Sequence, residues 1–272
     1  MARDPHRYVN ELEDAAIERL IARLEGRAKN EVFTRLFDKY AERLKLPAGA
    51  RVLEIGCGTG AVVRALARRP DFDGRALGVD HSPAFIAAAT RFAENEGLEG
   101  RVTFAVGDAH ALDEAEGEFD AVIAHTVISH VADPLAVLAQ MARRVRRGGT
   151  VAIFDGDYAS MTYAHPDHDF GRRMDEALVA ASFNNPRIMR ELPRRLPELG
   201  LHLAAAWGDA VTEVGSGSYF RSFIETYAPY IAPSGLAPAD AVDEWLRAQH
   251  EAMAAGTFFA ACTYYTYLAV RG

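Results

Sequence analysis

A glycine-rich stretch carries the residues whose types and spacing most clearly suggest chemistry. It runs Glu54-Ile-Gly56-Cys-Gly58-Thr-Gly60 and follows a short apolar segment that begins at residue 51. Glycine permits a positive φ angle and lets a ligand press against bare backbone. A helix that begins after such a turn points its N–H groups into the crevice beside the strand end. The stretch therefore predicts a cofactor site in that crevice.

The glycines alone do not decide which cofactor binds. Gly56-x-Gly58-x-x-Ala61 satisfies the loose dinucleotide fingerprint, and Asp80 lies near the place expected for a ribose-binding acid. Three features disfavour a dinucleotide. Glu54 precedes the first glycine by two residues, and Asp108 ends a third apolar segment, where an adenine amino group could donate to its carboxylate. The C-terminal half also offers no second dinucleotide-type βαβ unit.

The elements that would position these residues alternate along the chain. Apolar strands are predicted at 51–56, 75–80, 102–108, 119–126 and 150–154, with helices between them that begin near residues 61, 82 and 133. Ser82 is a good N-cap and Pro83 a good first helical residue. Strands that are apolar on both faces and alternate with helices indicate a parallel sheet covered on both sides. We therefore expect an α/β fold.

Three regions are predicted around this pattern. Residues 1–46 form two helices that Gly26 separates and that cap the cofactor site, residues 47–157 form the cofactor-binding core, and residues 158–272 complete the same fold. The last region is expected to contain two substrate-cap insertions, at about 158–186 and 215–256. The first insertion has no regular pattern, the second is expected to form two helices, and 258–270 is predicted to be the final strand.

The motifs, in order and with family-like spacing, resemble those of class I S-adenosylmethionine (SAM)-dependent methyltransferases, especially the group that includes the ubiquinone/menaquinone-biosynthesis enzymes. The matching stretches are VLEIGCGTG (52–60), GVD (78–80), VGDA (106–109), FDAVIAHTVISHVADP (119–134) and RRGGTVAIFD (146–155). The resemblance is strong over residues 30–155 and only architectural after 200. It implies a Rossmann-like, seven-stranded, mostly parallel sheet with an antiparallel last strand and helices on both faces.

The resemblance also implies roles for individual residues. The loop of Gly56, Gly58 and Gly60 would hold the methionine part of SAM, Asp80 both ribose hydroxyls, and Asp108 the adenine amino group. The predicted cofactor-binding set is Glu54, Gly56, Cys57, Gly58, Gly60, Asp80, His81, Asp108, Ala109 and His125.

His125 is the first candidate for catalysis, because an imidazole can accept a proton near neutral pH. The alternative is that it only contacts SAM. His130 is expected to be structural and to bond a nearby backbone group. Four aromatic side chains are expected to line an apolar substrate pocket: Tyr158, Phe183, Tyr219 and Phe223.

Metal binding is the weaker interpretation of several further polar residues. Asp155 and Asp157 follow the fifth predicted strand, as in magnesium-dependent catechol methyltransferases, and His165 and His168 form an H-x-x-H pair. The pair lacks the ligand count that a closed metal site needs. We therefore predict no metal.

Composition narrows the function. The net charge of −8 and the absence of a basic stripe disfavour nucleic-acid substrates. Two distant cysteines, no export signal and no apolar run of about 18 residues predict a cytoplasmic protein that does not enter a membrane. The predicted function is methyl transfer from SAM to an O, N or C atom of a small hydrophobic or aromatic metabolite, with a homodimer considered as the assembly. A SAM-binding enzyme that catalyses cyclisation, rearrangement or decarboxylation is the alternative.

Overall fold

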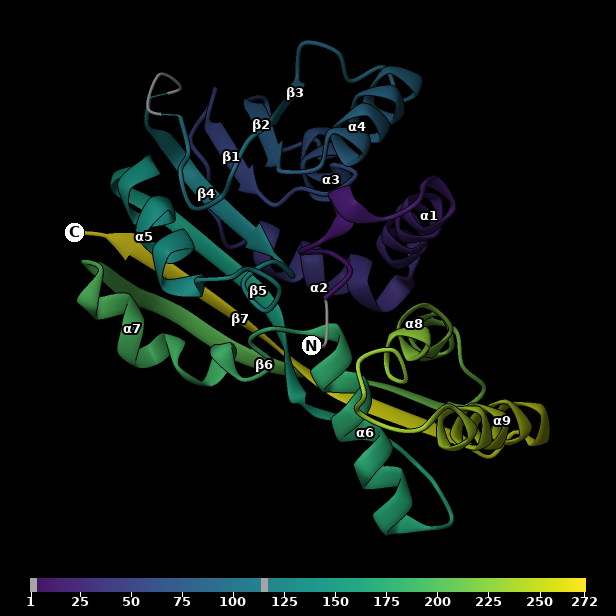
Figure 1. The fold of residues 1–272 in the computed structure, drawn as a ribbon. Helices are drawn as coiled ribbons and strands as arrows, with labels where there is room; N and C mark the ends of the chain where they lie inside the picture. The colour runs from purple at the N-terminus through teal and green to yellow at the C-terminus, as the bar shows by residue number, and fades with distance from the viewer. Residues whose placement is uncertain (1–3, 114–116) are drawn as a thin grey trace.

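A seven-stranded sheet forms the centre of the computed structural model, which describes residues 4–113 and 117–272. The strand order is β3-β2-β1-β4-β5-β7-β6 (Figure 1). Strand β7 pairs antiparallel with both β5 and β6, and the remaining pairs are parallel. The predicted α/β fold with an antiparallel last strand is thereby confirmed.

The elements follow the alternation expected from the sequence. The strands are β1 (Arg51–Ile55), β2 (Arg75–Asp80), β3 (Val102–Val106), β4 (Phe119–His125), β5 (Val145–Tyr163), β6 (Leu201–Gly215) and β7 (Phe258–Arg271). The α-helices are α1 (Asp14–Lys29), α2 (Glu31–Ala41), α3 (Ala61–Arg68), α4 (Pro83–Asn95), α5 (Pro134–Arg144), α6 (His168–Ser182), α7 (Leu192–Glu198), α8 (Tyr219–Tyr227) and α9 (Ala239–Ala255).

Side-chain alternation along the central strands decides which residues face the site. On β1, Val52 packs into the core that α2 and α3 cover, whereas Leu53 packs into the core on the opposite face with α5 and α7. Because successive side chains point to opposite faces of a sheet, Glu54 shares the face of Val52. On β4, Ile123 belongs to the same core as Val52, so His125 points to that face as well.

The region predicted to be irregular, 158–186, is regular in the structure. Strand β5 continues to Tyr163, paired with β7 through a register shift between Asp157 and Thr162, and α6 follows at His168. The Asp167 side chain caps α6 by accepting a hydrogen bond from the Phe170 N–H. The prediction was wrong because the pairing partner of this long strand lies about 100 residues further along the chain.

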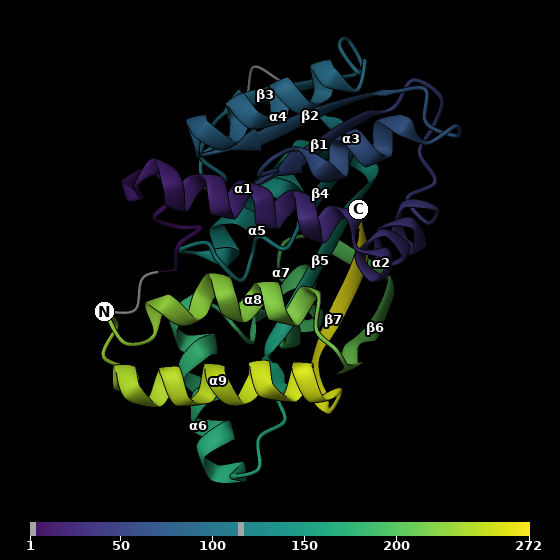
Figure 2. The ribbon, with the colours of Figure 1, turned by 90° about the vertical axis from the view of Figure 1, so that its right-hand side faces the viewer.

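The division of the N-terminal helices also differs from the prediction. Gly26 lies inside α1, and the break occurs at Asn30, whose side chain accepts a hydrogen bond from Val32 N–H and caps α2. Asparagine is a stronger N-cap than glycine, which explains the position of the break. Helix α1 lies between α8 on one side and α3 and α4 on the other (Figure 2).

The two helices predicted within 216–256 are present as α8 and α9, and the final strand follows them as β7. In Figure 1 these helices lie together with α6 at one end of the molecule, beyond the central strands. Within residues 4–113 and 117–272, no helix is both long and apolar enough to cross a membrane.

Candidate active site

The glycine turn after β1 has the backbone that its composition requires. Gly56, Gly58 and Gly60 have φ angles of +63°, +53° and +72°, which residues with a Cβ rarely adopt. A Cβ on Gly56 would also lie 2.7 Å from a methyl carbon of Val127. The turn is anchored by the hydrogen bond from Cys57 N–H to the Val79 carbonyl. The result is a bare stretch of backbone beside the end of β1.

Asp80, at the end of β2, joins the glycine turn to the next helix. Its carboxylate accepts the Gly58 N–H at 2.8 Å with one oxygen and the Ser82 N–H at 2.9 Å with the other. His81 Nδ1 lies 3.4 Å from the same carboxylate, and this contact raises the pKa of His81. Each carboxylate oxygen has a second lone pair, so both oxygens keep acceptor capacity for a ligand.

Glu54 is buried beneath the turn. Its carboxylate accepts the Val63 N–H at 3.2 Å, in the first turn of α3. Burial, with a smaller contribution from the nearby Asp80 charge, raises its pKa well above the usual value. A buried acid of this kind is stabilised by a cation or a proton, so Glu54 can hold an ammonium group at the turn.

A cavity of about 660 Å³ lies beside these residues and extends to the aromatic side chains. This volume falls within the range of small-molecule sites, about 300–1,000 Å³. The structure brings to its wall the following predicted site residues: Glu54, Gly56, Cys57, Gly58, Asp80, His81, Asp108, Ala109, His125, Tyr158, Phe183, Tyr219 and Phe223. Gly60 is the exception, because it lies at the N-cap of α3 and faces Phe104 instead.

Asp108 borders the cavity just after β3, and its side chain is 63% exposed. Its carboxylate accepts hydrogen bonds from the backbone N–H of His110, at 2.9 Å, and pairs with His110 Nδ1 at 2.7 Å. Partial burial acts to raise the pKa of Asp108, but the contacts with His110 keep it below its usual value. The sequence interpretation did not include His110, although it stands two residues after Asp108.

His125 is buried at the end of β4. Its Nδ1 lies 2.9 Å from the Tyr40 hydroxyl, and its ring packs against Phe154 at a centroid distance of 4.5 Å. Burial and the positive field of Arg27 lower its pKa well below the usual value. The imidazole is therefore neutral at physiological pH. The next residue, Thr126, has a φ of +56°, a strained conformation that is enriched at functional sites.

The other end of the cavity is aromatic. The rings of Tyr158 and Phe183 are stacked with centroids 3.5 Å apart, and Phe183 also stacks with Phe223 at 5.9 Å. Tyr219 completes this wall and hydrogen-bonds the Tyr264 hydroxyl at 2.5 Å. These rings come from β5, the segment after α6, and α8. An apolar body can pack against this wall.

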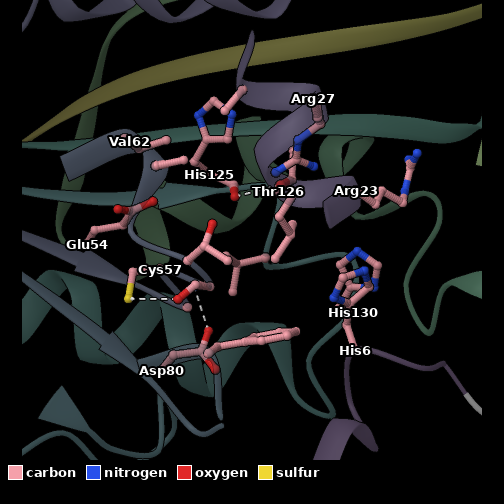
Figure 3. A pocket seen from close by; sticks show the side chains of 18 of the residues that line it. His6, Arg23, Arg27, Glu54, Cys57, Val62, Asp80, His125, Thr126 and His130 are labelled. Atoms are coloured by element: carbon pink, nitrogen blue, oxygen red, sulfur yellow. Dashed lines mark hydrogen bonds between the residues drawn. The ribbon is translucent and has the colours of Figure 1, made fainter. Parts of the chain in front are cut away.

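Several ionisable side chains at the cavity were absent from the predicted site. Arg23 and Arg27 enter it from α1, and His6 and His130 lie together with ring centroids 4.7 Å apart (Figure 3). Two arginines one helical turn apart were a visible signal in the sequence, since positions i and i+4 share a helix face. The pairing of His6 with His130 had no such signal.

The prediction that the His130 ring bonds a nearby backbone group was wrong. Its Nδ1 lies 2.7 Å from the carboxylate of Asp4, which is almost fully buried. The other oxygen of Asp4 accepts the His6 N–H at 2.9 Å. The carboxylate therefore orients the His130 ring and leaves its Nε2 as the nitrogen not committed to Asp4.

Three of the four residues considered for a metal are engaged in other contacts. Asp155 accepts hydrogen bonds from the Ser129 hydroxyl and N–H, and Asp157 forms an ion pair with Arg190 at 2.9 Å. His165 Nδ1 contacts the backbone of Asp167. In the part of the chain that the structure describes, no group of three or more His, Cys, Asp or Glu side chains is arranged to hold a metal ion.

This geometry defines a class of protein: an α/β chain with a bare glycine turn, acids at the ends of β2 and β3, and a cavity beside them. Residues 52–149 match the family model of the methyltransferase domain. The chain is 32% identical over 176 residues to the ubiquinone biosynthesis O-methyltransferase of Methylococcus capsulatus, a match that covers 59% of this chain and 67% of that protein.

Two further matches extend beyond the methyltransferase domain. An uncharacterized 37.1 kDa protein in transposon TN4556 of Streptomyces fradiae is 32% identical over 230 residues, which is 81% of this chain and 62% of that protein. The crystal structure of the cyclase SpnF shares the fold with a TM-score of 0.56 and 24% identity, over 87% of this chain and 80% of that one. The chain spans less than half the length of several other curated relatives.

The chain belongs to the class I SAM-dependent methyltransferases, an enzyme family whose cofactor is SAM. The family match thereby decides between the two cofactors that the glycine motif alone left open.

Proposed function

We propose that this chain transfers a methyl group from SAM to an O, N or C atom of a small hydrophobic or aromatic molecule. The observation that carries the proposal is the continuity of the cavity. A single space joins the glycine turn and the acids at one end to the stacked rings of Tyr158 and Phe183 at the other. A cofactor and an apolar acceptor can therefore occupy it side by side, which is the arrangement that direct group transfer needs.

The cofactor fits the chemistry of the residues at the turn. The bare backbone of Gly56 and Gly58 would take the methionine part, with Glu54 facing its ammonium group. Arg27, which lies near Glu54 and His125, would take its carboxylate (Figure 3). Asp80 would bind the ribose hydroxyls. Asp108, with Ala109 and His81 beside it, would bind the adenine. When bound, SAM supplies an electrophilic methyl group on a sulfonium.

An acceptor that is a hydroxyl or ammonium must also lose a proton. We propose His130 as the group that holds it, because Asp4 fixes the ring through Nδ1 and leaves Nε2 uncommitted to that carboxylate. The prediction that His125 is the base stays open, but its depressed pKa makes it a weaker proton acceptor. Its contact with Tyr40 is better suited to positioning the cofactor end of the cavity.

A non-methylation reaction in the same cavity is the second candidate function. The likeness to the cyclase SpnF supports it only at the level of the fold, since the two chains are 24% identical. A cyclase would need the aromatic wall to hold its substrate and would leave the methyl group of SAM in place. The predicted cytoplasmic location and homodimer remain expectations.

A screen with methyl-labelled SAM tests the proposal. The full chain is incubated with labelled SAM and a panel of phenols, amines and carboxylic acids, each with an apolar body. We expect label in at least one product and stoichiometric release of S-adenosylhomocysteine (SAH). Conversion of a panel member without label in its product would favour the second candidate.

A further inference from the structure

Arg23 is a buried cation in the aromatic half of the cavity. Its side chain lies on α1, only 8% of the residue is exposed, and it forms no ion pair with any residue that the structure describes. Three rings of α8 surround the guanidinium carbon at 4.9–5.2 Å: Tyr219, Phe223 and Tyr227. The guanidinium also donates to the Ser222 hydroxyl at 3.2 Å and is close enough to Tyr227 to interact with its hydroxyl.

A charge in this position is costly unless something compensates it. Burial of an ionised group without a counter-ion is unfavourable, and cation–π contacts offset only part of that penalty. A guanidinium has five donors and cannot lose its proton in a protein. A purely structural role, joining α1 to α8, would not need these donors to border an open cavity. Their position favours a ligand that brings a negative charge.

Arg23 and Arg27 lie in different chemical surroundings, and the two other arginines that border the cavity are the exposed Arg7 and Arg68, which pairs with Glu96. Arg27 lies near Glu54 and His125 at the cofactor end, and its charge also reaches Tyr158 and Tyr219 of the aromatic wall. Arg23 lies among the tyrosines of α8, on the side of His6 and His130 (Figure 3). SAM carries a single carboxylate, and Arg27 is placed to take it. Arg23 is then left for a second anion, which must belong to the acceptor.

We propose that the acceptor carries a carboxylate attached to an aromatic or other apolar body, with Arg23 binding the carboxylate and the Tyr158–Phe183 wall packing against the body. A planar guanidinium matches a carboxylate through two parallel hydrogen bonds. One arginine balances one negative charge, which favours a carboxylate over a phosphate dianion. That the bound anion is the methyl acceptor rests on the proposed function, but the anion site itself can be tested without methyl transfer.

The test compares acids with their uncharged amides. The full chain, with and without SAH, is titrated calorimetrically with benzoate and benzamide, and with 3-phenylpropanoate and 3-phenylpropanamide. We expect at least one acid to bind about tenfold or more tightly than its amide, since hydrogen bonds to charged groups are the stronger ones. Arg23→Gln should abolish this preference, and Arg23→Lys should keep part of it.

Arg19→Gln is the matched control, because Arg19 is an exposed arginine one turn earlier on α1. It should keep the full preference. Melting curves of each variant establish that it is folded, and Arg23→Lys preserves the charge if Arg23→Gln does not fold. Equal binding of every acid and its amide, or a preference that survives Arg23→Gln, would overturn the inference. Failure of the wild-type chain to bind SAH would count against the proposed function alone.

Discussion

His130 and Asp4 are 126 residues apart in the chain, yet they share a hydrogen bond in the cavity wall. The Asp4 carboxylate holds Nδ1 of the His130 ring and leaves Nε2 able to accept a proton from a substrate, which is the arrangement of an oriented base. The two residues therefore make separable contributions. His130 would hold the proton, and Asp4 would only position and stabilise the ring.

We expect His130→Gln to lower kcat by about 10²-fold or more, which is typical of a lost general base. Asp4→Asn should lower kcat less, since the ring remains. Neither change should alter SAH affinity, which calorimetry measures separately. A His130→Gln enzyme with unchanged kcat and an unchanged pH profile would contradict the assignment and favour His125 as the proton acceptor.

Asp175 gives a stability prediction away from the site. Burial beside Thr162 and Tyr163 raises its pKa to about 7. Because the folded pKa exceeds the unfolded one, the folded state binds more protons between about pH 4 and pH 7. The stability contribution of this group is full below about pH 4 and is lost as the pH rises through 7.

Asp175→Asn resembles the protonated acid and should therefore raise Tm by about 2 °C or more at pH 8. The difference should shrink at pH 5, where the wild-type carboxyl is already neutral. Differential scanning calorimetry at the two pH values checks this, with an exposed carboxylate of α9 changed in Glu244→Gln as the control. A variant that is less stable than wild type at both pH values would show that the carboxylate itself is required.

At the scale of elements, the glycine turn after β1 needs Gly56 for two separable reasons, its positive φ angle and the lack of room for a side chain. Gly97, which follows α4, shares only the first of them. Gly56 and Gly97 both have positive φ angles, +63° and +66°. A Cβ on Gly56 would collide with the branched side chain of Val127, whereas one on Gly97 would meet nothing within 4 Å. The two positions therefore share the backbone strain but not the clash.

Gly56→Ala should lower Tm by several degrees more than Gly97→Ala, because only the first also forces Val127 to move. Gly56→Ala should weaken SAH binding as well, since Gly56 borders the cavity. Melting curves and calorimetry on the two variants make the comparison. Equal losses in both variants would mean that the turn tolerates a side chain.

The elements that could be predicted best from the sequence are those determined by residues close together in the chain. The strand–turn–helix at residues 51–68 and the Ser82 cap on α4 were predictable, because the strand, the glycines and the cap stand next to one another. The length of β5 was not, because its outer part is stabilised by pairing with β7. The break between α1 and α2 was also misplaced, since Gly26 was given more weight than the Asn30 cap.

The candidate site divides in the same way. The cofactor residues cluster near motifs and could be predicted from them, although their roles remain proposals. Arg23 and His130 reach the cavity through tertiary packing of α1 and of the N-terminal segment, which no spacing in the sequence specifies. Of the four predicted aromatic residues, Tyr158 and Phe223 both stack on Phe183. Only the fold places these three rings opposite the glycine turn.

At the scale of the whole molecule, the cavity has two walls of different origin. The predicted cofactor residues, from Glu54 to His125, lie inside the matched methyltransferase domain of residues 52–149. Arg23, Tyr158 and Phe223 lie outside it and come from α1, β5 and α8. The shared domain therefore supplies most of the proposed cofactor half, to which α1 adds Arg27, and the remainder of the chain supplies Arg23 and the aromatic wall of the acceptor half. Specificity should change with the second set and cofactor affinity with the first.

The most direct test of this account is calorimetric titration of the full chain with SAH, SAM and NADH. Wild type should bind SAH and SAM with one site per chain and should not bind NADH. Asp80→Asn should weaken SAH binding by about tenfold or more, because the ribose would lose a charge-assisted acceptor. A chain that binds neither SAH nor SAM, or that binds SAH equally well after Asp80→Asn, would contradict the account.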